Sequence, residues 1–288
     1  MEPAAAAESS AQPSGPPASP TARSSAAPGP PAAALPFDDL AAGYDDVFSH
    51  SAIGSLLRRP LQRRLRAAFA AGDRVLELGC GTGEDAVNLA RHGVRVLATD
   101  ASPAMVAAAR RKVEDAGLRD LVEVRRLALE ELTRLGEPPF DGAFSSFGGF
   151  NCVRDPRGPA RDLAALLRPG ARLLLCVMGP LVPWEWGWFL LRGKPGKAFR
   201  RLRPGGAAWR GLVIRYPSIG AMKRAFDPEF RVRRTAALGV LLPPSYAGSW
   251  AARHPRLLSR LDRWERRWET LPPLPWLADH YLLELERR

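Results

Sequence analysis

The sequence predicts a doubly wound α/β domain with a mostly parallel sheet, on the strength of two observations. Short apolar runs typical of buried strands alternate with helix-forming segments between residues 74 and 177. The chain has 288 residues, of which 46% are hydrophobic, enough for one large core. Because strands that alternate with helices pair in parallel, we expect helices on both faces of the sheet.

Each expected element follows from a local signal. Ser102 and Pro103 mark a helix start, since serine caps a helix and proline suits its first turn. Upstream, residues 37–48 have helical spacing, and a second helix is expected to follow Pro60 and to end near Phe69. The strands are expected at 74–78, 94–99, 122–126, 141–145 and 172–177, and the helices between them at 84–91, 103–116 and 159–167.

After Gly179 the regular alternation stops. A short strand is expected at 212–216, a helix at 219–226, a longer strand at 230–242, a basic helix at 254–269 and a last strand at 280–285. Such late strands can close a parallel sheet in antiparallel fashion. The organisation predicted is an Ala/Pro/Ser-rich disordered tail over residues 1–35 and one domain over 36–288, in which 181–277 contribute a substrate cap.

Charge is unevenly distributed along the chain. Residues 1–150 carry a net charge of −3 and residues 151–288 a net charge of +15, and all eight tryptophans follow residue 180. Arginine outnumbers lysine 38 to 4, so a bias in genome composition is an alternative explanation of the excess. Three scattered cysteines argue against a disulfide scaffold or a cysteine zinc site, and they suit a reducing cytoplasm.

The most informative stretch is a glycine-rich loop between a strand and a helix. Gly79, Gly81 and Gly83 allow a tight turn that approaches a ligand closely, and Asp100 ends the next strand, 21 residues after Gly79. A carboxylate at that distance can accept hydrogen bonds from both hydroxyls of a ribose. Acids at positions 84 and 85 would repel a pyrophosphate, whereas Glu77 suits an ammonium or sulfonium group.

These residues resemble the class I S-adenosylmethionine-dependent methyltransferases, with matching segments at 75–83, 97–102, 140–148 and 166–179. The resemblance implies a seven-stranded Rossmann-like methyltransferase fold and S-adenosyl-L-methionine as cofactor. Ala128 departs from the family pattern, which often has an acid there for the adenine. The residues that the resemblance places around the cofactor are Tyr44, Glu77, Gly79, Cys80, Gly81, Gly83, Asp100, Ala101, Met105, Leu129 and Ser146.

The acceptor side offers fewer signals. Residues after the fourth strand should face the transferred methyl group, and no strong base lies among them. His50 and Glu185 are the predicted catalytic residues, with His280 a further candidate base. The predicted substrate-binding residues are Phe147, Phe150, Asn151, Trp184 and Trp188. No His/Asp cluster has ligand spacing, so no metal is expected.

Together these features predict a cytoplasmic enzyme that methylates a small organic acceptor, most readily on oxygen. One alternative is an RNA methyltransferase, favoured by the basic half but opposed by the absence of RNA-binding modules and of the family's Pro-containing tetrapeptide. Another is a non-catalytic cofactor-binding scaffold. The identity of the acceptor and the oligomeric state are left open by the sequence.

The segment from Pro180 to Arg203 has three competing interpretations. Its first half is rich in tryptophan and leucine, with Glu185 its only acid, and its second half is rich in arginine and lysine. The twelve-residue apolar run is too short to span a bilayer, which needs about 20 residues. The segment is interpreted as ordinary core with a solvated face, as the mouth of an apolar acceptor pocket, or as a peripheral contact with an anionic membrane.

Overall fold

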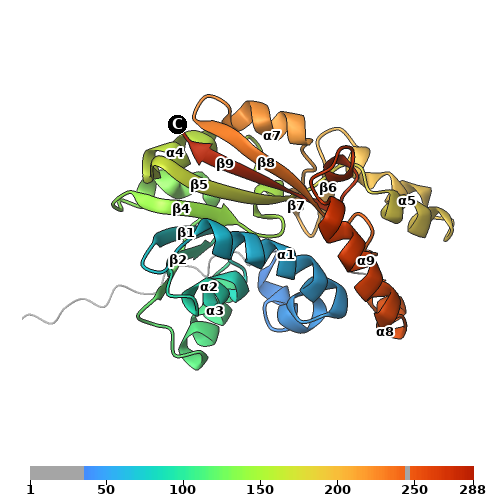
Figure 1. Cartoon of the computed structure of the whole chain (residues 1–288), viewed down its shortest axis with the longest axis horizontal. Coiled ribbons are helices and arrows are strands. Elements are labelled where there is room, and N and C mark those ends of the chain that lie inside the picture. Colours follow the sequence, from blue (N-terminus) through green and yellow to red (C-terminus); the bar gives the residue numbers. More distant parts are fainter. Residues whose placement is uncertain (1–35, 244–246) are drawn as a thin grey trace, which may run out of the picture. The chain divides into compact units, whose positions relative to one another are not determined.

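The computed structural model describes residues 36–243 and 247–288, so the predicted tail over 1–35 lies outside the described residues. These described residues form one compact unit. Its seven-stranded sheet has the order β3-β2-β1-β4-β5-β9-β8, with β9 antiparallel to both neighbours and the other pairs parallel (Figure 1). The strands are β1 Arg74–Leu78, β2 Arg95–Asp100, β3 Val122–Arg126, β4 Phe140–Ser145, β5 Leu167–Met178, β8 Phe230–Leu238 and β9 His280–Arg287. The predicted mostly parallel, seven-stranded fold is therefore confirmed.

Helices cover both faces of this sheet, as Figure 1 shows. On one face lie α1 Ala52–Ala68, α2 Glu84–Ala90 and α3 Pro103–Asp115, and on the other α4 Arg157–Leu166 and α7 Ile219–Phe226. Side chains alternate along β5, with Leu173 and Leu175 in one core and Leu174 and Cys176 in the other. This alternation makes the central strands apolar on both faces, which is why they read as continuous apolar runs.

The remaining elements lie beyond the end of β5 and around β8. They are α5 Pro183–Leu190, α6 Pro195–Ala198, α8 Gly248–Arg253, α9 Pro255–Trp268 and a separate hairpin of β6 Ala207–Trp209 and β7 Leu212–Ile214. A cluster of buried apolar side chains joins α8 and α9 to the start of α1, and Trp188 of α5 packs against it. Of these elements, the sequence predicted β7 and α9, but not α5, α6, α8 or β6. No helix in the described part of the chain has the length and apolar composition needed to cross a membrane.

Two predictions near the N-terminus are wrong. Residues 37–48 do not form one helix but a 3-10 turn, Asp38–Leu40, and a π-helical turn, Asp45–Ser49. The next helix does not start after Pro60 but at Ala52, because the Ser51 hydroxyl caps it by accepting the Gly54 amide at 3.0 Å. Pro60 is buried inside α1, where burial offsets the hydrogen bond that proline cannot donate.

Arg64 of α1 ties two distant parts of the chain to the sheet. Its guanidinium pairs with Glu284 of β9 and with Glu269 just after α9, and all three side chains are at least 88% buried. Arg172 lies 3.2 Å from Glu284 and Arg63 lies 3.7 Å from Glu269. Removing one partner of a buried pair leaves the other charge without compensation, which destabilises the folded state.

We expect Arg64→Ala to lower the free energy of unfolding by about 3 kcal/mol, the lower part of the range for broken buried pairs, because Arg172 and Arg63 remain. Urea unfolding followed by circular dichroism measures it. Arg59→Ala, on the exposed face of the same helix, is the matched control and should change the free energy by no more than about 0.5 kcal/mol. Equal effects of the two substitutions would show that the buried pair is not stabilising.

Candidate functional site

The candidate site lies at the edge where the parallel strands end. The glycine loop Gly79–Gly83 follows β1, Asp100 ends β2, and Ser146 and Phe147 follow β4. Open parallel sheets bind ligands at this edge, because the strand ends and helix starts there leave backbone groups free. A hollow in this region is lined by Tyr44, Arg58, Gly79, Cys80, Gly81, Thr82, Glu84, Asp85, Ser146 and Phe147.

Asp100 fixes the geometry of the glycine loop. One carboxylate oxygen accepts the Gly81 amide at 2.8 Å and the other accepts the Ser102 amide at 2.9 Å. Burial raises the pKa of Asp100, although these backbone hydrogen bonds act in the opposite direction. Gly81 has a φ of 54°, in the left-handed region that glycine adopts without strain. The conformation of the loop is therefore fixed by Asp100, and the carboxylate keeps lone pairs for further donors.

The two acids at the start of α2 are both compensated. Arg58 of α1 forms a buried ion pair with Asp85, and the Gln62 amide donates to the same carboxylate at 3.0 Å. Glu84 lies 2.8 Å from the Lys112 ammonium. The repulsion of a pyrophosphate that the sequence suggests is therefore weaker than expected, because each carboxylate is paired with a cation.

Beneath the loop lie two buried polar atoms that have no hydrogen-bond partner among the described residues. They are Oε2 of Glu77, a side chain buried in β1, and the hydroxyl of Ser146. Burial, with Asp85 as the next cause, raises the pKa of Glu77 well above its ordinary value. An orphaned buried carboxylate oxygen is costly unless a donor or cation reaches it. The residues present therefore fit a ligand that carries a positive charge.

The segment 36–51 closes over the glycine loop. Asp45 accepts the Thr82 hydroxyl at 2.7 Å and lies 2.6 Å from Lys112, and Asp38 accepts hydrogen bonds from Ser102 and Ala104 at the start of α3. The hollow has a volume of about 40 Å³, below the roughly 300–1,000 Å³ of ligand pockets. In this conformation the hollow is therefore smaller than a cofactor-sized ligand.

Phe147 connects the glycine loop to α1, to β9 and to the apolar cluster shared with α8 and α9. Its φ of 38° is unusual for a residue with a side chain, and such strain persists only where surrounding contacts maintain it. The ring lies 5.3 Å from the ring of Phe48 and 5.2 Å from that of His280, and the Arg58 guanidinium lies 4.8 Å from its centroid. Phe147 also packs against the apolar cluster shared by α1, α8 and α9.

His280, together with its neighbour Asp279, lies beside Phe147. His280 Nδ1 lies 3.1 Å from Asp279 Oδ2, and both side chains are buried. Burial favours the neutral form of Asp279, but Arg201 and His280 outweigh it and hold the pKa of this carboxyl well below its usual range. A carboxylate beside an imidazole can orient the ring.

The two predicted catalytic residues occupy different environments. The His50 side chain is 59% exposed and lies 3.6 Å from Glu84. Glu185 is buried in α5, with Arg200 at 2.9 Å and Arg201 at 2.8 Å. The Glu185 carboxylate is thus engaged by two guanidiniums. Both assignments stay predictions.

The predicted acceptor residues do not all gather at one place. Phe150 lies in the core, 5.8 Å from the ring of Phe226. The fully buried Asn151 amide donates to the Met178 and Arg215 carbonyls at 3.1 and 2.6 Å and accepts the Met178 amide at 2.9 Å, so its side chain holds the end of β5. In this conformation neither side chain is open to an acceptor.

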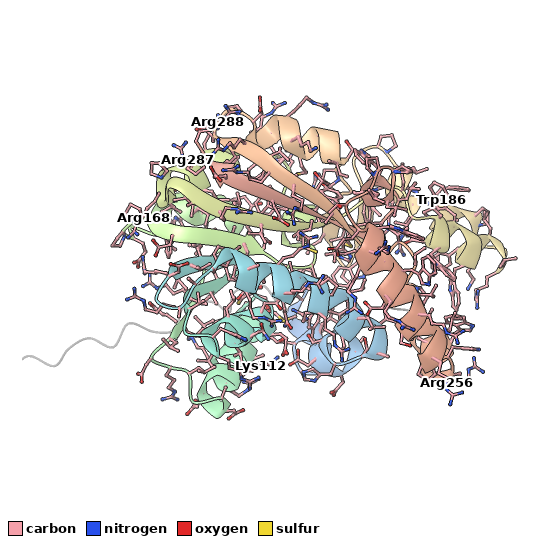
Figure 2. The ribbon with its side chains drawn as sticks, in the orientation of Figure 1. Lys112, Arg168, Trp186, Arg256, Arg287 and Arg288 are labelled. Carbon is pink, nitrogen blue, oxygen red and sulfur yellow. The ribbon has the colours of Figure 1, made fainter. Side chains whose placement is uncertain are left out.

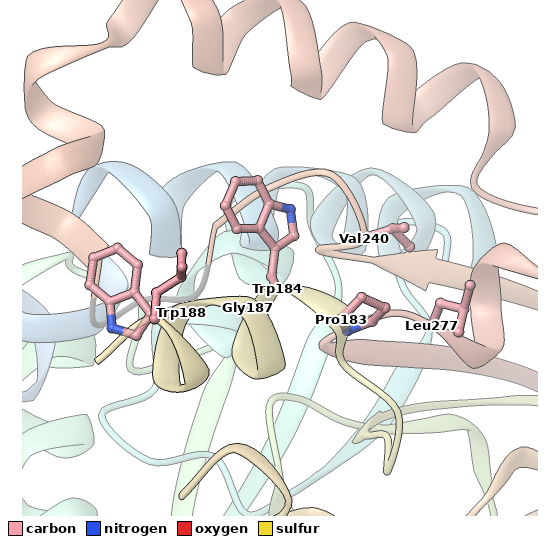
Figure 3. A pocket seen from close by; sticks show the side chains of 7 residues that line it. Pro183, Trp184, Gly187, Trp188, Val240 and Leu277 are labelled. Atoms are coloured by element: carbon pink, nitrogen blue, oxygen red, sulfur yellow. The ribbon is translucent and has the colours of Figure 1, made fainter. Parts of the chain in front are cut away.

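Trp184 and Trp188 line a separate apolar groove of about 370 Å³ (Figure 3). The other lining residues are Pro183, Gly187, Leu191, Val240 and Leu277. The predicted adenine neighbours differ in burial: Met105 is buried, Leu129 is half-buried and Ala101 is exposed. Their assignment to the cofactor also stays a prediction.

A cluster of possible metal ligands surrounds the lysine already described. Ligand atoms of Asp45, His50 and Glu84 lie within 4.8 Å of one another. The ammonium of Lys112 lies 2.6 Å from Asp45 and 2.8 Å from Glu84, so the two carboxylates share one cation. The expectation that the chain uses no metal stays a prediction.

Sequence reasoning missed Arg58, Phe48 and Asp38. Arg58 belongs to a helix distant in sequence from the glycine loop, and nothing local distinguishes it from the neighbouring Arg59. Asp38 lies in the 37–48 stretch, where the sequence indicates only helical spacing. The serine cap at Ser51 is the signal that would have placed α1, and with it the face that carries Arg58.

Comparison with known proteins agrees with this geometry. Residues 75–170 match the family model described as a methyltransferase domain. The chain is 32% identical to a demethylmenaquinone methyltransferase of Clavibacter sepedonicus over 51% of this chain and 58% of that protein. It is 32% identical to an S-adenosyl-L-methionine-dependent Diels-Alderase of Talaromyces variabilis, over 48% and 50%. It is 35% identical to a ubiquinone biosynthesis O-methyltransferase of Xanthomonas axonopodis, over 38% and 44%.

The chain therefore spans about half the length of the curated relatives it matches. Among solved structures, a putative sarcosine dimethylglycine methyltransferase from Galdieria sulphuraria aligns with a TM-score of 0.57 over 86% of this chain and 98% of that one. Its 16% identity supports the fold alone. The glycine loop and the strand order thus agree with the similarity of residues 75–170 to a methyltransferase domain.

Proposed function

We propose that this chain transfers a methyl group from S-adenosylmethionine to a small organic acceptor, most readily to an oxygen atom. The observation that carries the proposal is the pair of orphaned polar atoms, on Glu77 and Ser146, buried beside the glycine loop and Asp100. The cofactor supplies the methyl group on a sulfonium. The chain's own residues would bind and align it, with Asp100 toward the ribose, and exclude water.

The cap supports an apolar acceptor. Phe147 and Trp188 both pack against the apolar cluster of α1, α8 and α9, so the acceptor side of the site adjoins apolar surface. The groove lined by Trp184 and Trp188 has a volume within the usual range for small-molecule pockets. Quinone-related names among the relatives are consistent with an aromatic acceptor, but they belong to those proteins.

Oxygen methylation needs a proton acceptor when the substrate hydroxyl is not already ionised. We propose His280 for this role, with Asp279 as its positioning residue, because its ring contacts Phe147 and it pairs with a buried carboxylate. His50 and Glu185 remain the alternatives. Of the rival functions, an RNA methyltransferase would require a nucleic-acid surface, and a scaffold would bind cofactor without turnover.

The cofactor assignment predicts the effect of Asp100→Ala. We expect it to weaken the binding of S-adenosylhomocysteine by about 1–3 kcal/mol, the value of hydrogen bonds to a charged group, and NAD should not bind the unmodified chain. Isothermal titration calorimetry measures both. Asp115→Ala, at the exposed end of α3, is the matched control. Unchanged affinity in Asp100→Ala, with an unchanged unfolding midpoint, would contradict the assignment.

The raised pKa of Glu77 predicts a pH dependence. In the ligand-free protein, the contribution of Glu77 to the free energy of unfolding is largest below the ordinary pKa of a glutamate carboxyl. That contribution is lost as the pH rises through the raised pKa of Glu77. A cationic ligand favours the ionised carboxylate, so affinity for S-adenosylmethionine should rise with pH over that same range, with proton release.

Calorimetry in buffers of different ionisation enthalpy measures the proton release. We expect Glu77→Gln to abolish that release and to flatten the pH dependence. S-adenosylhomocysteine, which lacks the sulfonium charge, should show a shallower dependence on the unmodified chain. An identical slope in Glu77→Gln would remove Glu77 from the site.

The assignment of His280 predicts a selective loss of turnover. With a panel of phenols, quinols and alcohols, and with S-adenosylhomocysteine release as readout, we expect His280→Gln to lower kcat by at least about 100-fold. Cofactor affinity should be retained, and the acidic limb of the pH–rate profile should disappear. His50→Gln and Glu185→Gln test the alternatives, and His92→Gln, at an exposed helix end, is the control.

A normal pH–rate profile in His280→Gln would exclude His280 as the base. Cofactor binding without turnover of any acceptor would favour the scaffold. Conversion of an acceptor without release of S-adenosylhomocysteine would point to the non-methylating chemistry that the Diels-Alderase name describes.

A further inference from the structure

The outward face of α9 combines aligned cations with exposed apolar side chains. Arg256, Arg260, Arg263 and Arg267 recur at intervals of three and four residues and therefore share one stripe, which is exposed throughout. Leu257 and Trp264 lie beside this stripe and are 42% and 53% exposed. Within the described residues, no carboxylate forms an ion pair with these four arginines.

The acids of α9 face the other way. Glu265 is buried and accepts the backbone amides of Gly239, Leu241 and Leu242 just after β8. Asp262 is buried too and pairs with Arg266 at 3.1 Å. The inward face thus anchors the helix to the domain, and the charged side chains on the outward stripe are all cations.

A second segment of the same character includes the end of α5 and the residues after it. The end of α5 exposes Leu190 and Leu191, the latter 88% exposed, and Arg192, Lys194 and Lys197 follow at exposed positions. Trp184 of α5 lies 6.4 Å from Trp250 of α8, which joins α5 to the start of the α8–α9 pair.

Figures 1 and 2 show α5 and the α8–α9 pair at the same end of the domain. In Figure 2, Arg256 is labelled near the α8 end of that pair. The apolar groove lies at this end, and Leu191 is part of its lining. We call the outward face of α9 together with residues 190–197 the α5–α9 face.

We propose that the α5–α9 face docks on a membrane surface that contains anionic phospholipids. Cations beside exposed leucine and tryptophan side chains suit such a surface, because the cations pair with headgroup phosphates while the apolar groups enter the boundary with the acyl chains. This inference rests on charge and exposure alone, so it stands or falls separately from methyl transfer.

A nucleic acid fits the same cations less well. In a nucleic-acid complex the arginines would contact phosphates and an aromatic ring could stack on a base. Neither contact explains why Leu190, Leu191 and Leu257 are exposed on the surface. Exposed aliphatic side chains next to a polybasic stripe are instead the pattern of interfacial helices. We therefore commit to the membrane, and nucleic-acid binding becomes an outcome of the test.

Vesicle co-sedimentation of the full chain tests the proposal. We expect binding to phosphatidylcholine vesicles that contain about one-third phosphatidylserine, little binding to phosphatidylcholine alone, and release by salt, since screening weakens surface attraction. Replacing Arg256, Arg260, Arg263 and Arg267 by Gln should weaken binding at least about tenfold, because several headgroup attractions are lost together.

The matched control replaces Arg91, Arg111, Arg154 and Arg161 by Gln, which removes the same charge from exposed positions outside the α5–α9 face. It should bind vesicles more tightly than the α9 variant and nearly as well as the unmodified chain. Leu191→Ser with Leu257→Ser should keep the dependence on phosphatidylserine but release more readily in salt.

Three results would overturn the proposal. They are an absence of binding to the phosphatidylserine vesicles, equal losses in the α9 variant and its matched control, and tighter binding to an RNA oligonucleotide that the α9 variant alone loses. Circular dichroism and S-adenosylhomocysteine affinity confirm that each variant is folded, and they keep a failure of this proposal separate from a failure of the proposed activity.

Discussion

The hydrogen bonds of the Asp100 carboxylate to the backbone of Gly81 and Ser102 are the constraint on which the site depends. They fix the loop after β1 relative to the end of β2 and the start of α3, and Asp38 caps that same helix start. A buried carboxylate is costly, as its raised pKa indicates, and backbone donors offset part of the cost. The chain thus maintains a charge near the sheet edge that packing alone would not favour.

That charge is one of several buried together. Asp85 lies close enough to Glu77 to raise the free-energy cost of ionising Glu77. Arg58 compensates Asp85 through an ion pair. The Arg58 guanidinium also contacts the ring of Phe147. The arrangement leaves an excess of negative charge beneath the loop. A ligand with a positive group relieves that excess, so the same electrostatics that destabilises the ligand-free domain contributes to affinity. Function and stability are opposed at this edge of the sheet.

The central strands and the glycine loop were predictable because their signals are local. The run from Arg74 to Leu78 matches β1 residue for residue, since burial on both faces requires continuous apolar character. What sequence reasoning missed depends on partners distant in the chain. Pro60 suggested a helix start, but burial against the sheet lets α1 run through it. The engagement of Glu185 by Arg200 and Arg201 depends on the path of the chain between them, which no periodicity reveals.

The excess of arginine in the second half also gains meaning from the fold. A compositional bias adds arginines regardless of their neighbours. On its own it would therefore not place them on one face of a helix. Along β8, Arg231 and Arg233 both pair with Glu286 of the adjacent strand, so one carboxylate offsets part of their charge within the sheet. On α9 the acids turn inward, where Glu265 caps a loop, while four arginines share the outward stripe. A helix that directs its acids inward and its cations outward has the asymmetry that an anionic surface would select, and composition alone does not account for that orientation.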